Sequence, residues 1–247
     1  MNVNTKTART AGVLYIIIFV AGIVADFIIR ASLIVPADAT ATAENIMASE
    51  GLFRLSIASD FTMILSDVAI ALLFYVLLRP VNNTLALMAA FFRLAQATTL
   101  GINLLNLLFV TQLLGGADYL AVFDAEQSNA LALMFLDGHA TGYRIALVFF
   151  AISIAVLGYL LIKADYFPTI LGIGLLVAAL GYLTDSFANF LLTNYEDYQS
   201  MLEVVVFVPA VIAELALALY LLIKGVNVQR QDEGIALNTS QAEAMHA

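Results

Sequence analysis

Residues 53–106 decide the fold; they read FRLSIASDFTMILSDVAIALLFYVLLRPVNNTLALMAAFFRLAQATTLGINLLN. Two long apolar segments flank a short break at residues 79–83, where Pro80 interrupts helical hydrogen bonding. Each segment is long enough to cross a hydrocarbon core of about 30 Å as a helix. The stretch also carries side chains that lipid disfavours, namely Arg54, Asp60, Asp67, Arg93, Gln96, Asn103 and Asn106. We therefore expect a membrane hairpin whose polar faces look into the protein.

The composition of the whole chain supports this reading. Of its 247 residues, 62% are hydrophobic and 12% are charged, whereas soluble domains are about 45–50% apolar and about 25% charged. The chain contains no cysteine, so it can form neither a disulfide nor a thiolate site. These features predict an integral membrane protein that contacts the lipid bilayer and is not built to bind nucleic acid.

Hydropathy divides the chain into six expected spans, and the fold class is therefore an all-α bundle of six transmembrane helices. The spans are residues 11–35, 52–79, 84–114, 138–162, 168–192 and 200–223. Residues 126–136 form an amphipathic stretch that we expect to be a short surface helix between the third and fourth spans. Residues 1–224 then make one membrane domain, and residues 225–247 a polar, disordered tail on the cytoplasmic side.

The distribution of charge predicts the orientation. In a trace with six spans, one side of the membrane receives the basic residues Lys6, Arg9, Arg79, Lys163, Lys224 and Arg230. The loops on the other side carry acidic residues and no base: Asp38, Glu44, Glu50, Asp118, Asp124, Glu126, Asp137, Glu196 and Asp197. Because basic loops stay in the cytoplasm, we expect a multi-pass protein of the plasma membrane with both termini cytoplasmic.

Three stretches resemble a known family. They are TARTAGVLYIIIFVAG (7–22), ALLFYVLLRPVNNTLALMAAFFRLAQA (71–97) and LGYLLIKADYFPTILGIGLL (157–176). Together they are similar to the family called domain of unknown function 4386, and the resemblance extends over about residues 7–224. It implies a multi-pass membrane protein of bacteria or archaea. The family has no assigned activity, so the resemblance adds no catalytic residue and no cofactor.

The charges inside the spans must be compensated. A lone charge at the centre of a membrane helix costs about 2.5–3.5 kcal/mol on insertion scales, and arginine cannot lose its proton. Arg93 therefore needs a carboxylate, and Asp67 and Glu214 lie at matching depth. Alternatively, burial holds Glu214 protonated. Asp26 and Arg30 are four residues apart, so they can pair on one helix face.

A second group of charges is expected nearer the end of the bundle away from the termini. Arg144 lies there at the depth of Asp60 and Asp185. With the mid-depth group and the polar arc of the third span, this defines a candidate ligand-binding site or intramembrane charge network. Its members are Asp60, Asp67, Arg93, Gln96, Asn103, Arg144, Asp185 and Glu214.

Three functions remain open at this point. The first is an outward-facing polar cavity that binds or transports a small polar or charged solute. The second is a structural or partner subunit of a membrane complex, whose buried ion pairs only fix helix packing. The third is an intramembrane enzyme with paired carboxylates. We assign no catalytic residue and favour a role other than catalysis. We expect no metal, because His139 has no second histidine near it and the second histidine, His246, lies in the tail.

Overall fold

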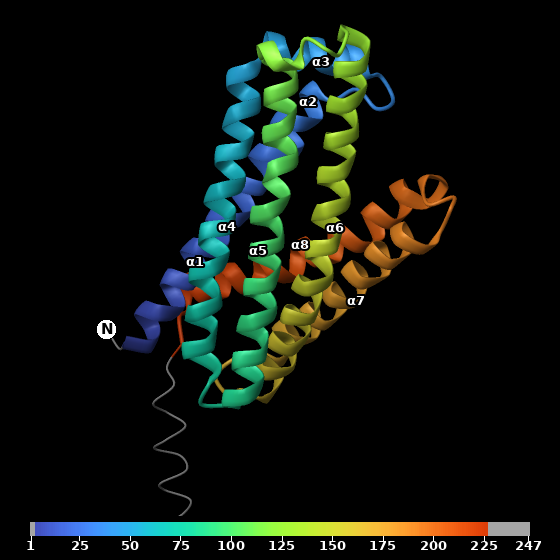
Figure 1. The fold of residues 1–247 in the computed structure, drawn as a ribbon. Coiled ribbons are helices and arrows are strands. Elements are labelled where there is room, and N and C mark those ends of the chain that lie inside the picture. The colour runs from blue at the N-terminus through green and yellow to red at the C-terminus, as the bar shows by residue number, and fades with distance from the viewer. Residues whose placement is uncertain (1–2, 227–247) are drawn as a thin grey trace, which may run out of the picture.

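The computed structural model describes residues 3–226, which form helices and no strand (Figure 1). Within this range six segments are long and apolar enough to cross a membrane, which confirms the expected multi-pass bundle. They are Thr5–Leu33, Glu50–Leu78, Asn83–Leu114, Ala125–Lys163, Thr169–Leu191 and Asp197–Ile223. Residues 227–247 of the expected tail lie outside the described range.

The first span is composite, and the other spans are single helices. It consists of α1 (Val3–Gly22), the π-helix η1 (Ile23–Arg30) and α2 (Ala31–Leu33). The remaining spans are α4 (Glu50–Leu78), α5 (Asn83–Leu114), α6 (Ala125–Lys163), α7 (Thr169–Leu191) and α8 (Glu196–Ile223). Two short helices lie in connections, α3 (Ala39–Ala48) and the 3₁₀ turn η2 (Asp118–Leu120).

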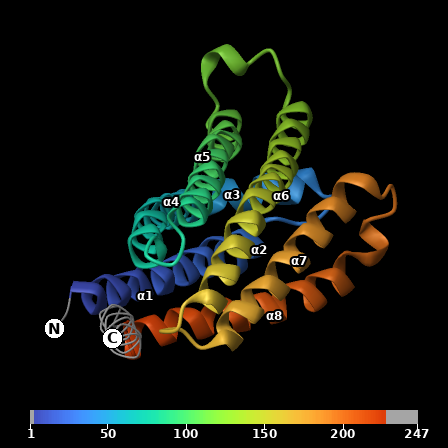
Figure 2. The same cartoon turned by 90° about the horizontal axis from the view of Figure 1, so that it is seen from below.

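The six spans form a ring in which each packs against its neighbours in sequence and α8 returns to α1. Both ends of the described chain lie at one end of this ring, which we call the terminal end. There the Thr5 hydroxyl donates a hydrogen bond of 3.0 Å to the carbonyl oxygen of Val226, so the packed bundle continues two residues beyond 224. Figures 1 and 2 show that the α7–α8 hairpin leans away from the other spans.

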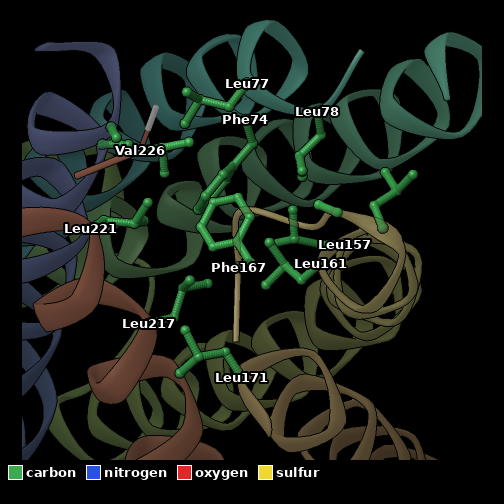
Figure 3. Packing of buried hydrophobic residues seen from close by; sticks show 14 of the residues in the cluster. Phe74, Leu77, Leu78, Leu157, Leu161, Phe167, Leu171, Leu217, Leu221 and Val226 are labelled. Atoms are coloured by element: carbon green, nitrogen blue, oxygen red, sulfur yellow. The ribbon is translucent and has the colours of Figure 1, made fainter. Parts of the chain in front are cut away.

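A large apolar cluster fills the terminal end (Figure 3). It joins side chains from all six spans and from the segment between α6 and α7. Those at its centre include Phe74, Leu77, Leu78, Leu157, Leu161, Phe167, Leu171, Leu217 and Leu221. Burial of these side chains excludes water, so this half of the bundle is a closed plug. We call the opposite end of the ring, which lies beyond this cluster, the far end.

The prediction that residues 126–136 form a separate short surface helix is wrong. These residues are the first turns of α6, which runs unbroken for 39 residues. Asp124 caps the helix in a capping box with Gln127, and Ala132 and Leu136 are buried in the core beside α5. Gly138 lies inside this helix, where an added Cβ would be 3.4 Å from the side-chain oxygen of Asn106 in α5. At about 1.5 Å per residue, α6 extends well beyond a ~30 Å hydrocarbon core.

A short helix does lie at the far end, but in a different connection. It is α3, within the segment between the first and second spans that the sequence indicated only as polar. The Asp38 side chain caps it by accepting a hydrogen bond of 2.9 Å from the backbone nitrogen of Ala41. Thr42 and Ile46 then anchor α3 against the bundle, because both are almost fully buried.

Close contact between α6 and α7 generates a test of the packing. A Cβ at Gly172 would meet the carbonyl oxygen of Gly158 and lie 2.6 Å from a side-chain carbon of Ile162. A Cβ at Gly101 of α5 would meet no atom within 4 Å. We expect Gly172→Ala to destabilise the protein by about 1–3 kcal/mol through overpacking, and Gly101→Ala to be neutral or stabilising by up to about 1 kcal/mol.

The measurement is the midpoint of thermal unfolding of both purified variants in the same detergent. Because the two substitutions add the same methyl group to a helical glycine, their difference reports only on the space available. Equal midpoints for the two variants would contradict the close α6–α7 contact.

Candidate functional site

A cavity of about 700 Å³ lies inside the bundle, and all six spans contribute side chains to its wall. Its polar lining comprises Asp26, Arg30, Asp67, Arg93, Gln96, His139, Tyr143, Arg144, Tyr182, Asp185, Tyr195 and Glu214. Of the eight residues expected in the site, six line this cavity. The other two, Asp60 and Asn103, stand behind the wall and contact residues that do line it.

Arg93 and Asp67 form the ion pair at the centre of the site. Nη2 of Arg93 lies 2.6 Å from Oδ1 of Asp67, and the Gln96 amide donates a hydrogen bond of 3.1 Å to the other carboxylate oxygen. The guanidinium lies between the rings of Tyr15 and Phe150, with its carbon 5.2 and 5.0 Å from their centroids. Of the two carboxylates expected at the depth of Arg93, it is Asp67 that forms the ion pair. The guanidinium also makes cation–π contacts with two rings.

Glu214 is held differently, by hydroxyl groups. Its two carboxylate oxygens accept hydrogen bonds of 2.9 Å from Tyr15 and 2.8 Å from Tyr182. Within residues 3–226, no basic group forms an ion pair with it. The sequence did not point to these tyrosines, because a tyrosine within an apolar run carries no signal of what its hydroxyl contacts.

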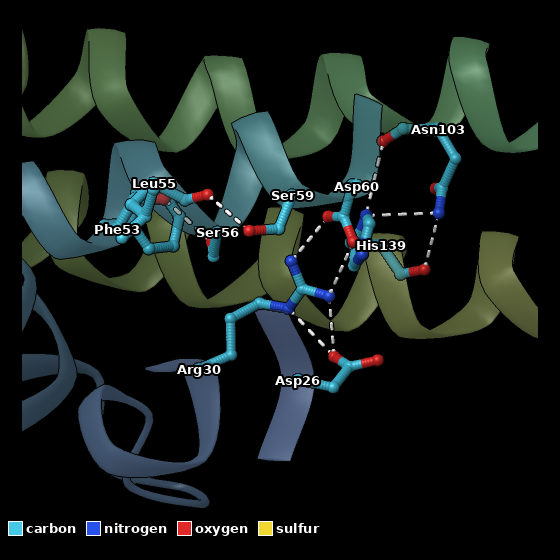
Figure 4. A network of polar contacts seen from close by, with 9 residues as sticks. All are labelled: Asp26, Arg30, Phe53, Leu55, Ser56, Ser59, Asp60, Asn103 and His139. Atoms are coloured by element: carbon cyan, nitrogen blue, oxygen red, sulfur yellow. Dashed lines mark hydrogen bonds and ion pairs between the residues drawn. The ribbon is translucent and has the colours of Figure 1, made fainter. Parts of the chain in front are cut away.

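A second ion cluster surrounds Arg30 nearer the far end (Figure 4). Arg30 lies 2.7 Å from Asp26, which is the expected pair, and 2.6 Å from Asp60 of α4. Asp60, which the sequence placed at the depth of Arg144, thus pairs with Arg30. Arg30 is the last residue of the π-helix η1, and such segments are rare and occur often at functional sites.

His139 lies beside this cluster and is held by Asn103 (Figure 4). The Asn103 amide nitrogen lies 3.1 Å from Nδ1 of His139 and donates a hydrogen bond of 2.9 Å to its carbonyl oxygen. Gly142, one turn further along α6, makes room for Asn103, since a Cβ there would overlap the amide. In the described part of the chain, no group of three His, Asp or Glu side chains is arranged to hold a metal ion.

Arg144 and Asp185 are linked through a tyrosine. The Tyr195 hydroxyl donates a hydrogen bond of 2.8 Å to Asp185, and the guanidinium carbon of Arg144 lies 5.3 Å from the centroid of the Tyr195 ring. Burial raises the pKa of Tyr195, and the hydrogen bond to Asp185 raises it further. The hydroxyl thus keeps its proton and connects the two charged groups, which the sequence placed at the same depth.

The cavity reaches the far end and also opens sideways. Pro36 and Tyr195, which lie outside the spans, form its far-end limit. Its lining also includes Ile23, Phe27 and Val211, whose side chains are 47%, 71% and 40% exposed although they belong to membrane-spanning segments. Apolar side chains that are exposed within membrane-spanning segments suit contact with acyl chains, so we expect the cavity to communicate with lipid as well.

The divergence of the first and last spans produces this sideways opening. Near the terminal end they touch, because Gly12 packs against the backbone of Leu222 and Tyr15 reaches Glu214. Further along, η1 packs on α4, whereas the first half of α8 packs on α7 through contacts such as Val206 with Gly181. The wall between η1 and α8 is therefore incomplete.

The central ion pair generates a prediction about stability. Asp67→Asn leaves Arg93 charged and buried without a carboxylate, so we expect a loss of about 3–5 kcal/mol. The control is Glu50→Gln, which breaks the Arg54–Glu50 pair, whose side chains are 58% and 57% exposed. We expect this control to cost at most about 1 kcal/mol.

Thermal unfolding in detergent measures both variants. Replacing Asp67 and Arg93 together with Leu and Met removes both charges and should recover most of the loss. If Asp67→Asn unfolds at the same temperature as Glu50→Gln, the pair does not have the energetic role assigned to it.

Comparison with known proteins agrees with the resemblance noted in the sequence. The family model described as domain of unknown function (DUF4386) matches residues 10–225. An uncharacterised protein of Archaeoglobus fulgidus is 30% identical over 135 residues, which cover 55% of this chain and 67% of that protein. No solved structure matches this chain. The protein described above, a bundle of membrane-spanning helices around a charged cavity, belongs to the DUF4386 family.

Proposed function

We propose that this protein binds a small molecule inside the membrane and transports it through the cavity between its helices. The observation that carries the proposal is the cavity of about 700 Å³ lined by charged side chains from all six spans. Ligand sites commonly enclose about 300–1,000 Å³ and present a few polar groups on an otherwise apolar wall. The charged lining and the apolar rim together suit a ligand with both a charged and an apolar part.

The cavity argues against a purely structural role for the charges. Ion pairs that only fix helix packing stabilise a bundle most when the surrounding side chains fill the space around them, because the atoms that border a void lack van der Waals contacts on that side. Here the Arg93–Asp67 pair and Glu214 are themselves buried, with 2–5% of their surfaces exposed, but they line a cavity of about 700 Å³ that the neighbouring side chains leave unfilled. Because intramembrane charges are costly and are usually kept for a function, their position on a cavity wall supports binding.

Catalysis on a membrane-dissolved substrate is a second candidate. The sideways opening favours it, because such a substrate could enter from lipid, and the carboxylates of Asp67, Asp185 and Glu214 line one cavity. We prefer binding, because each of these carboxylates already accepts hydrogen bonds from an arginine or a tyrosine. None of the three is left free to exchange a proton with a substrate.

The distribution of basic residues supports one orientation of the bundle in the membrane. Lys6, Arg79, Lys163 and Lys224 lie at or next to the terminal ends of their helices. Under the rule that basic segments stay in the cytoplasm, we place the terminal end in the cytoplasm of a plasma membrane. The apolar plug then closes the cavity on that side, and the solute reaches the site from the outer half of the membrane.

The cysteine-free chain allows a direct test of water in the cavity. Ala140 lines the cavity, whereas Ile102 of α5 is 64% exposed and does not line it. The two positions lie at similar depth, because Asn103 contacts His139. We expect Ala140→Cys to react with a charged, water-soluble methanethiosulfonate and Ile102→Cys to remain unmodified, since thiolates form only where water reaches.

The modification is measured by mass spectrometry on the full chain in lipid vesicles. An unmodified Ala140→Cys, with normal reaction after unfolding in detergent, would show that the space is not open to water. That result would overturn the proposed function.

A further inference from the structure

We propose that the cavity selects an organic cation with an apolar body, such as a substituted ammonium, and that Glu214 neutralises the charge of this ligand. This inference rests on the proposed function and specifies its class of substrate. It follows from the balance of charge around the cavity, the surroundings of Glu214, and the chemistry of the wall beside it.

Carboxyl groups outnumber basic groups around the cavity. The groups that line or support the cavity include three guanidinium groups, from Arg30, Arg93 and Arg144, and five carboxyl groups, from Asp26, Asp60, Asp67, Asp185 and Glu214. One of the surplus carboxylates is Asp26, which shares Arg30 with Asp60 and whose side chain is 44% exposed. The other surplus is buried.

Glu214 is the buried carboxyl group that has no basic group to match it. Asp67 holds Arg93 directly, and Tyr195 links Asp185 to Arg144, whereas the partners of Glu214 are two neutral hydroxyl groups. Glu214 is only 5% exposed. Hydrogen bonds from tyrosine stabilise a carboxylate but do not cancel its charge, and a buried charge is stable only with an opposite charge nearby. Arg93 is close enough to attract Glu214, but its single charge is already matched by Asp67. A cation in the cavity supplies that charge.

Aromatic rings line the wall next to Glu214. The hydroxyl of Tyr182 donates to Glu214, and the centroid of its ring lies 5.6 Å from that of Phe150 and 6.0 Å from that of Phe207, with interplanar angles of 62° and 86°. All three rings border the cavity. Aromatic faces attract cations, and more strongly where water is excluded. The protein already uses such contacts for its own cations, with Arg93 on Phe150 and Arg144 on Tyr195.

An unpartnered acceptor lies in the same region. Oε1 of Gln96 is buried without a hydrogen-bond partner, and Gln96 lines the cavity with 6% of its surface exposed. Its orientation is determined, since the carboxylate of Asp67 can only accept and therefore requires the amide nitrogen. Nη1 of Arg93 is also unpartnered, but the charge of Arg93 is matched by Asp67. The oxygen end of this amide dipole is negative, so it adds to the preference of this part of the wall for a positive charge.

The route of entry explains the apolar body. Ile23, Phe27 and Val211 line the opening toward lipid, and all three are exposed. A cation that carries apolar groups partitions into the membrane and can pass this rim, whereas a small hydrated cation would have to lose its water there.

The test uses two ions of nearly equal size and opposite charge, tetraphenylphosphonium and tetraphenylborate. Binding of each to the purified full chain is measured by equilibrium dialysis in the same detergent. We expect tetraphenylphosphonium to bind and tetraphenylborate to bind at least about tenfold more weakly, a difference of about 1.4 kcal/mol. Glu214→Gln should weaken tetraphenylphosphonium binding by about tenfold or more, while Glu214→Asp, which keeps the charge, should retain most of it.

Glu50→Gln is the matched control, because it removes an exposed carboxylate far from the cavity and should leave binding unchanged. Glu214→Gln keeps an acceptor for Tyr15 and Tyr182, and thermal unfolding checks that it is folded. Equal binding of both ions, preference for the borate, no binding of either ion, or full binding by folded Glu214→Gln would each overturn the cation inference. Reaction of Ala140→Cys with the charged thiol reagent would show in each case that the proposed cavity function survives.

Discussion

The whole architecture depends on a charge that cannot be removed. Arginine keeps its proton even in hydrocarbon, so a guanidinium at the depth of Arg93 is tolerated only where the protein surrounds it. Asp67 from α4 neutralises it, and Tyr15 from α1 and Phe150 from α6 cover its faces. The side chain belongs to α5, so one compensated charge ties four of the six spans together. The Arg30 cluster repeats this logic between η1 and α4.

These compensated charges occupy only one half of the bundle. The half near the termini is filled by the apolar cluster around Phe74 and Leu161, which needs no polar partner and packs closely. The charged half cannot pack in that way, because each ion pair keeps its own geometry and requires polar neighbours. The two halves thus differ in what fills them, and the cavity begins where the apolar cluster ends, with Glu214 and Tyr182 at its wall. The divergence of α8 from η1 extends that space toward lipid.

Some partners of the buried charges could be predicted from the sequence and others could not. Spacing correctly placed Asp26 with Arg30, because residues four apart on a helix share a face, and depth allowed Asp67 for Arg93. Depth did not identify the partner of Asp60, which pairs with Arg30 and not with Arg144, the base placed at its level. Spans at one depth offer several partners, and only the order of helices around the ring decides between them. The tyrosines that hold Glu214 and Asp185 gave no signal at all.

The sequence by itself determined the six spans, the even topology that brings the two ends of the described residues together, and the polar faces of α4 and α5. It could do so because hydrocarbon penalises every unmatched polar group, which leaves a local mark in composition and spacing. Only the tertiary structure decided that residues 126–136 belong to α6, that η1 is a π-helix, and that the charged groups border a cavity. These features arise from contacts between helices distant in sequence, whose energies depend on shape and not on local pattern.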